Sequence, residues 1–184
     1  MQHFTNETLN IDELPKYEEV PLQPLHPDYW KVMLISRIIF FMILGVVTGL
    51  LLFFKEEIRE FWLYFALTLL LLFAVSLFFG KLSFKKKGFA FRKHDVLYKS
   101  GIISETTTII PFNRIQHVAL NEGIFARMFG LASIGIFTAG GGDSDIEIPG
   151  IEREKAQQIK QLLMSKLSDE PNKPSAENGG ESEL

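Results

Sequence analysis

The sequence predicts a two-helix transmembrane hairpin followed by a small α+β domain. Two uninterrupted apolar segments, at about 32–54 and 61–79, lie within residues 31–80. The second half of the chain alternates short strand-like segments with turns and ends in a helical pattern. Hydrophobic residues make up 47% of the 184 residues, with 17 Phe, and the excess is concentrated in the two apolar segments. We therefore treat the two halves separately.

Each apolar segment has the length and composition of a membrane-spanning helix. The first carries one charge, Arg37, near its start, and the second carries none. A helix needs about 20 apolar residues to cross the ~30 Å hydrocarbon layer, and neither segment has the polar stripe of a soluble core helix. A cleaved signal peptide is excluded because the first segment starts too deep in the chain, follows an acidic N-terminus and is too long.

The basic residues predict the orientation of the hairpin. The six residues 55–60 can join only antiparallel neighbours, so both termini lie on the same side of the membrane. The loop carries Lys55 and Arg59, whereas a larger basic group follows the second segment. Its members are Lys81, Lys85, Lys86, Lys87, Arg92 and Lys93. The positive-inside rule predicts a multi-pass protein of the cytoplasmic (inner) membrane, with an external loop and both termini in the cytoplasm. The absence of Cys agrees with a reducing compartment.

Charge divides the chain further. Residues 1–30 are acidic and are predicted to be a disordered cytoplasmic arm, and residues 169–184 are predicted to be an acidic disordered tail. Residues 81–87 are predicted to be a basic juxtamembrane linker. Residues 88–168 remain as the part with enough apolar content to fold.

Short alternating segments between 88 and 152 predict an antiparallel sheet or small split barrel of about six or seven strands. The expected strands are 89–92, 96–99, 102–112, 118–121, 134–138 and 146–148, with turns at 93–95 and 140–144. One amphipathic helix is expected to cap them, because apolar residues then recur at helical spacing. These residues are Ala156, Ile159, Leu163 and Leu167. Strands closed by one C-terminal helix make an α+β domain.

A run of motifs lies in the same region. Gly101 is followed by Ile-Pro-Phe-Asn-Arg-Ile-Gln-His-Val at 110–118, by Arg-Met-Phe-Gly-Leu-Ala at 127–132, by Thr-Ala-Gly at 138–140 and by Pro-Gly-Ile at 149–151. This run, together with the paired helices, resembles the YdbS-like bacterial pleckstrin-homology (PH) domain, also called the membrane-flanked domain, over roughly residues 30–167. The resemblance implies a PH-like barrel without known catalytic residues, in a protein that works within a membrane complex. The framework positions are Gly101, Pro111, Arg114, Gln116, His117, Gly130, Leu131, Thr138, Gly140 and Gly150.

The polar motif residues have two interpretations. Arg114, Gln116 and His117 could form a catalytic or phosphate-binding cluster, or Arg114 and Gln116 could hydrogen-bond the backbone at an irregular strand entry. Catalysis needs an activated nucleophile or a paired acid and base. The chain has no Cys, no nucleophile-elbow Ser, and four His without metal-ligand spacing. We favour the framework interpretation and expect no enzymatic activity, cofactor or metal. Asp143 and Asp145, beside three glycines, are interpreted as a hairpin tip.

Two functional hypotheses follow. The favoured one is a non-enzymatic, membrane-anchored PH-like module that assembles with itself or with a second PH-type membrane protein at the cytoplasmic face. The alternative is a reader of anionic lipid headgroups or of a phosphorylated ligand. It would use the barrel rim and a basic surface of Lys85, Lys86, Lys87, Arg92 and Lys93, at about 1 kcal/mol per basic residue near the membrane. An acid, Asp95, in the loop 93–95 weakens it. Neither hypothesis involves nucleic acid.

Four further positions carry expectations. Gly130, at a turn into a strand, is expected to adopt a conformation that a Cβ disfavours. Phe137 is expected to point outward from an unpaired strand edge and to form the docking surface of an assembly module. Gly45 and Gly49 have the spacing that lets a second helix approach closely.

Overall fold

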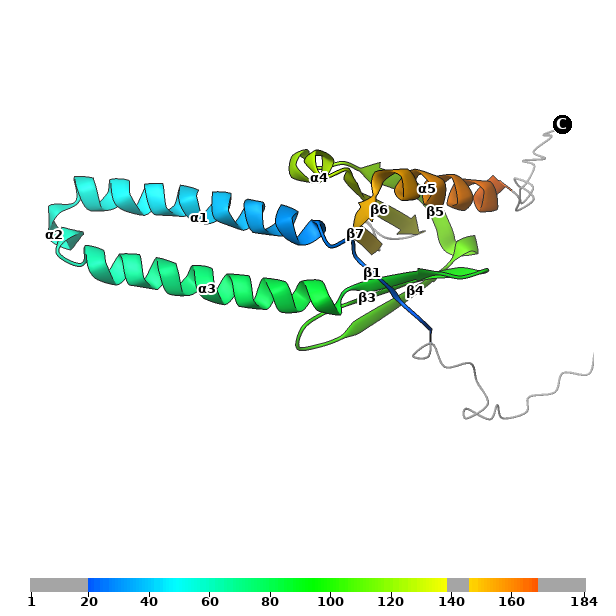
Figure 1. Cartoon of the computed structure of the whole chain (residues 1–184), viewed down its shortest axis with the longest axis horizontal. Coiled ribbons are helices and arrows are strands. Elements are labelled where there is room, and N and C mark those ends of the chain that lie inside the picture. The colour runs from blue at the N-terminus through cyan, green and yellow to red at the C-terminus, as the bar shows by residue number, and fades with distance from the viewer. Residues whose placement is uncertain (1–19, 139–145, 169–184) are drawn as a thin grey trace, which may run out of the picture.

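The computed structural model describes residues 20–138 and 146–168 and has the predicted architecture of a helical hairpin joined to an α+β domain (Figure 1). Two long antiparallel helices, α1 (Tyr29–Phe54) and α3 (Trp62–Lys86), are connected through the short α2 (Glu56–Arg59). The hairpin extends from one end of the domain. Both long helices are long and apolar enough to cross a membrane, and most of their apolar side chains are exposed, as contact with lipid requires.

The charge inside the first apolar segment is satisfied by the second helix. The Nε of Arg37 donates a hydrogen bond to the Oγ of Ser76 at 3.2 Å. The guanidinium lies against Gly80, where a Cβ would stand 2.5 Å from the Cζ of Arg37. A Cβ on Gly45 would make an ordinary contact with Leu69 at 3.5 Å, and a Cβ on Gly49 would meet nothing within 4 Å. Within the described chain, the packing of α1 on α3 therefore requires glycine at position 80 and at neither 45 nor 49.

The predicted linker at 81–87 is wrong, because α3 continues as a helix to Lys86. Lys87 alone separates it from β2. Lysine is a good helix former, and Lys85 and Lys86 in the last turn complement the negative end of the helix dipole. The basic residues therefore extend the helix beyond the apolar segment instead of ending it.

Two antiparallel sheets form the domain. The first has the strand order β1-β2-β3-β4, with β1 at Gln23–Pro24, β2 at Gly88–Phe91, β3 at Asp95–Ser100 and β4 at Thr106–Pro111. A 3-10 turn at Phe112–Arg114 leads to the second sheet. Its order is β5-β6-β7, with β5 at Ile115–Asn121, β6 at Leu131–Thr138 and β7 at Ile146–Glu152. Between β5 and β6 lies α4 (Ile124–Met128), and α5 (Arg153–Ser168) packs on this sheet.

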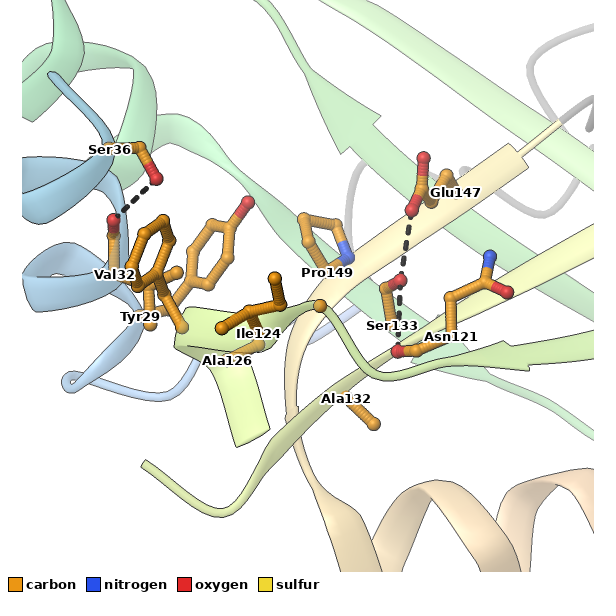
Figure 2. Close-up of a pocket in the computed structure, with 13 residues that line it drawn as sticks. Tyr29, Val32, Ser36, Asn121, Ile124, Ala126, Ala132, Ser133, Glu147 and Pro149 are labelled. Carbon is orange, nitrogen blue, oxygen red and sulfur yellow. Dashed lines mark hydrogen bonds between the residues drawn. The ribbon is translucent and has the colours of Figure 1, made fainter. Parts of the chain in front are cut away.

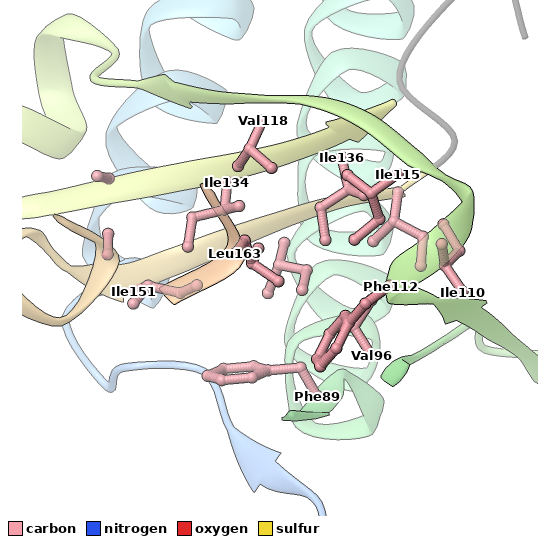
Figure 3. Packing of buried hydrophobic residues seen from close by; sticks show 14 of the residues in the cluster. Phe89, Val96, Ile110, Phe112, Ile115, Val118, Ile134, Ile136, Ile151 and Leu163 are labelled. Carbon is pink, nitrogen blue, oxygen red and sulfur yellow. The ribbon is translucent and has the colours of Figure 1, made fainter. Parts of the chain in front are cut away.

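The core lies between the two sheets and α5. Figure 3 shows side chains from both sheets meeting Leu163 of α5, with Phe89 and Phe112 at one end. Ala156 and Leu163 are fully buried and Ile159 is partly buried, so the amphipathic pattern identified the packed face of α5. The side chain of Leu167 lies outside the described residues. Two sheets closed by one helix confirm the predicted split-barrel architecture.

The predicted disordered arm over residues 1–30 is wrong for residues 20–30. Strand β1 pairs with β2, with Gln23 opposite Phe89. Leu25 is only 3% exposed and belongs to the core, and the backbone N–H of His26 donates to the carbonyl of Gly150 at 2.9 Å. The segment before the first membrane helix is therefore part of the domain. Residues 1–19 and the predicted tail at 169–184 lie outside the described residues.

Several strand boundaries also differ from the prediction, and β5 and β6 each begin three residues earlier than expected, at 115 and 131. Residues 101–105 form a loop, so β4 starts at Thr106 and not at 102. Strand β7 runs through Pro149 and Gly150 to Glu152, beyond the predicted end at 148. Proline is tolerated there because β7 is an edge strand, where a missing N–H costs no ladder hydrogen bond.

Candidate functional site

A hollow of about 310 Å³ lies where the first membrane helix meets the domain (Figure 2). Tyr29, Val32 and Ser36 of α1 form one wall. The other walls come from α4 and from the open face of the second sheet. They are Asn121, Gly123, Ile124, Phe125, Ala126, Ala132, Ser133, Glu147, Pro149 and Gly150. The hollow is therefore level with the start of the apolar segment at residue 32.

The polar groups of this hollow bond to one another. The Oγ of Ser36 donates to the carbonyl of Val32 at 3.0 Å, and the Oγ of Ser133 donates to the Oε1 of Glu147 at 2.9 Å. Glu147 is the one carboxylate in the lining, and no Lys, His or Cys lines it. The one hydroxyl that lies beside a possible base is that of Ser133, next to Glu147, and the lining adds no His, Lys or Cys to activate it. The geometry is that of a packing junction.

The three consecutive lysines after the membrane helix do not form one free cationic surface. The Nζ of Lys86 donates to the carbonyl of Ile102 at 3.0 Å and to the Oε1 of Glu105 at 2.9 Å. Lys99 pairs with the other oxygen of Glu105 at 2.8 Å. Hydrogen bonds from Lys99 and then Lys86 lower the pKa of Glu105 to about 2. Lys87 is half-buried, and its burial lowers its pKa. Of the three consecutive lysines, Lys85 alone is exposed.

Arg92 and Lys93 lie elsewhere. The Nε and Nη2 of Arg92 donate to the two carboxylate oxygens of Asp95, each at 2.5 Å. These hydrogen bonds raise the pKa of Arg92. Strand β2 begins one residue after α3, and four residues rise about 13 Å at 3.3 Å each. The β2–β3 turn therefore lies at the end of the sheet away from the hairpin, and the five predicted lipid-facing residues do not share one surface.

Three motif glycines have backbone conformations that favour glycine. Their φ angles are +116° at Gly101, +66° at Gly130 and +65° at Gly150, which confirms the expectation for Gly130. At Gly101 a Cβ would overlap the carbonyl oxygen of Ser104, so this glycine permits the tight loop at 101–105. Leu131 is buried. Gly140 and the acidic pair at 143–145 lie outside the described residues.

The predicted backbone hydrogen bonds of Arg114 and Gln116 are not present among the described residues. Both side chains are exposed. Arg114 ends the 3-10 turn, and Gln116 lies at the bulge between Ile115 and His117, where the β5–β6 register shifts. The predicted framework hydrogen bonds of these two side chains are therefore absent from the described structure.

Phe137 does not belong to an edge strand, although the pairing of its strand with β7 reaches only Ile136 in the described residues. It lies on β6, the central strand of its sheet, and its ring stacks on His117 with centroids 4.1 Å apart. The Cα of Thr138 is paired with that of Ile115 on β5. In the described part of the chain, the first sheet has two edges, the two-residue β1 and the six-residue β4, and β4 is paired only with β3. The position expected to dock a partner was therefore assigned to the wrong strand.

Sequence reasoning missed Glu105, which binds both Lys86 and Lys99. No local pattern signals this acid, because its partners lie 19 and 6 residues away. The described residues contain no group of three His, Asp or Glu side chains that could hold a metal ion.

Two membrane helices that lead directly into two antiparallel sheets and a capping helix define a membrane protein with a PH-like domain. The model of the Bacterial PH domain family matches residues 36–167, so the chain belongs to that family. It is similar to the UPF0699 transmembrane protein YdbS of Bacillus subtilis (strain 168), with 32% identity over 71 residues, 39% of this chain and 43% of that protein.

It is also similar to the UPF0699 transmembrane protein YdbT of the same organism, with 32% identity over 56 residues, 30% of this chain and 11% of that protein. The matched stretches span less than half the length of either relative. No solved structure matches the chain. The family and the membrane location are therefore established. The short matched stretches assign no activity or partner to this chain.

Proposed function

We propose that this protein is a non-enzymatic assembly module whose PH-like domain faces the cytoplasm from the inner membrane. It binds a second copy of itself or a second PH-type membrane protein. The observation that supports this proposal is the open edge of β4. An edge strand with free N–H and C=O groups can accept an extended segment of a partner as an additional strand.

The hydrogen bonds identify which groups of β4 are available. The N–H of Phe112 donates to the carbonyl of His94 at 2.9 Å, on the β3 side. Because backbone groups alternate along a strand, those of Ile110 and Thr108 also point to β3, and those of Thr107 and Ile109 point outward. Pro111, which has no N–H, falls on the outward side, where proline is tolerated. Ile109 is 38% exposed and gives this edge an apolar side chain.

The two relatives give a second reason. YdbS and YdbT are different proteins of one bacterium, and both resemble this chain. A cell with one such protein can therefore contain a related partner with a similar domain. An edge-to-edge contact between two similar sheets needs no additional binding motif, which fits a domain without a catalytic set in its described residues.

The alternative function, a reader of anionic headgroups, has weaker support. Glu105 binds two of the lysines, and Asp95 binds Arg92. Of the five predicted lipid-facing residues, only Lys85 and Lys93 are exposed, and they lie at opposite ends of the first sheet. Headgroup recognition needs several cations that converge on one phosphate.

The test compares two neighbouring proline substitutions in the full-length protein. Thr107→Pro removes an outward N–H, so the domain is expected to fold and to lose its complex in a crosslinking pull-down from native membranes. Thr108→Pro removes an inward ladder hydrogen bond and is expected to lower the thermal stability of the domain. Phe137→Asp, on the central strand, is the control that should keep the complex. A complex that survives Thr107→Pro in the folded protein contradicts the proposal.

A further inference from the structure

Three large apolar side chains of the domain are left in the open. Outside the helices of the hairpin, the most exposed large apolar residues among those described are Ile103 at 95%, Ile124 at 73% and Met128 at 72%. Ile124 and Met128 are four residues apart on α4 and so lie on one face of it. Ile103 lies in the loop between β3 and β4. We call these the α4 tip and the loop tip.

The α4 tip lies at the depth where the membrane segment begins. Ile124, Phe125 and Ala126 line the same hollow as Val32 and Ser36 of α1. The ammonium of Lys31 is 5.9 Å from the ring centroid of Phe129, which follows α4. The apolar segment starts at residue 32, and at 1.5 Å per residue Ser36 is about 6 Å inside it. Interfacial helices bury their apolar face about 5–10 Å into the headgroup and acyl boundary.

The loop tip lies on the other side of the hairpin. Figure 1 shows the β3–β4 loop turning back beside α3, while α4 lies beside α1. Lys86 of α3 holds the loop through the carbonyl of Ile102 and the carboxylate of Glu105. Ile102 and Glu105 thus attach the loop to the end of α3. Ile103, which lies between them, is almost fully exposed and contacts little of the domain.

We infer that both tips insert into the lipid leaflet on the domain's side of the membrane and fix the domain against the bilayer. The occupant is lipid because α4 adjoins the start of α1 and the β3–β4 loop is held to the last turn of α3, so both tips lie next to the ends of the membrane helices. Basic residues flank both tips, with Arg127 exposed on α4 and Lys85 exposed beside the loop. This suits the anionic headgroup layer. The inference concerns how the domain is held and is independent of the partner that β4 binds.

The natural absence of Cys allows a direct depth measurement. Single substitutions Ile103→Cys, Ile124→Cys and Met128→Cys in the full chain would carry a nitroxide spin label. The protein would be placed, one copy per disc, in nanodiscs of phosphatidylglycerol and phosphatidylethanolamine. Collision of the label with O2, which concentrates in lipid, and with a water-soluble nickel chelate would be measured by electron paramagnetic resonance. Lys93→Cys is the water-exposed control, and Phe53→Cys in α1 is the lipid-exposed control.

The O2-to-nickel collision ratio is expected to be roughly threefold or more above that of Lys93→Cys at all three tip positions, in the direction of Phe53→Cys. A ratio equal to that of Lys93→Cys would overturn the inference. Low collision with both reagents would also overturn it, because this pattern indicates burial against protein. With one copy per disc, contact with a second copy cannot be what shields the label from the nickel chelate. Circular dichroism checks that each labelled variant is folded.

Discussion

Tyr29, in the first turn of α1, lies directly against Gly150 of β7, where a Cβ would stand 2.6 Å from the Cγ of its ring. The same glycine accepts the backbone hydrogen bond from His26 and has a φ of +65°. The start of the first membrane helix is thus packed on the last strand of the domain. This contact can form only while residue 150 has no side chain.

Gly150→Ala is expected to destabilise the protein more than Gly130→Ala. Both glycines have nearly the same positive φ, so both substitutions carry the left-handed backbone cost of about 1–2 kcal/mol. A Cβ at Gly130 would meet nothing within 4 Å, whereas at Gly150 it overlaps Tyr29, which adds about 1–3 kcal/mol of overpacking. Thermal unfolding in detergent measures the difference. Tyr29→Ala should recover part of the loss in the Gly150→Ala protein; equal effects of the two alanines would disprove the contact.

Leu25→Ala is expected to lower the free energy of unfolding by about 2–4 kcal/mol, because it leaves a cavity in the core. Leu25 is 3% exposed, although it precedes the first membrane helix. Leu162→Ala on α5 is the matched control, since Leu162 is 47% exposed and should change little. Denaturant unfolding of the domain compares them. If the two variants are equally stable, residues 20–30 are not part of the folded domain.

Glu105 predicts a defined acid dependence. Its pKa is about 2 in the folded protein, against an ordinary value of 4.5. A carboxylate with a depressed pKa stabilises the fold fully above about pH 4.5, and this contribution disappears as the pH falls through 2. The stability difference between wild type and Glu105→Gln should therefore shrink progressively between pH 5 and 2. Glu154→Gln, at an exposed acid without an ion pair in the described chain, is the control. A difference that does not vary with pH would show that Glu105 is not held by its two lysines.

The orientation of the hairpin is testable with reporter fusions. The charge asymmetry around the two helices predicts that a C-terminal fusion is active with a reporter that works only in the cytoplasm, and inactive with a reporter that works only outside the membrane. The same reporter inserted after Glu57, in the loop, should be active only on the outer side. The opposite pair of results would show that the domain lies outside the cell, and would contradict the proposal of assembly at the cytoplasmic face.

The architecture was predictable because its signals are long. The two apolar segments and the periodic face of α5, with Ala156 and Leu163, each extend over several turns. The missed elements are short or depend on distant neighbours. Strand β1 has two residues, and Leu25 lies between prolines, so no period marks it. The five residues of α4 are too few for a helical pattern.

Side-chain partners were less predictable than strands. The link from Glu105 to Lys86 exists only after β3 and β4 have paired and the loop has returned to α3. The alternation of side chains along β6 indicated that Phe137 faces away from the core. It did not indicate that β6 is the central strand, because that depends on the pairing of β7 with β6 on the side opposite β5. Alternation reports which face a residue occupies, and the order of strands in a sheet is set by tertiary packing.

The direct junction between α3 and β2 has a consequence for encounters on the membrane. A flexible linker of n residues lets a domain explore about 5–6 Å × √n around its anchor, but Lys87 alone separates the helix from the strand, and four residues separate β1 from α1. The β4 edge is therefore carried at one height above the bilayer and with one orientation. Under the proposal that β4 binds a partner, that partner would have to present its own strand at the same height as the two proteins diffuse laterally, so the short junction would restrict which membrane proteins can pair with this one.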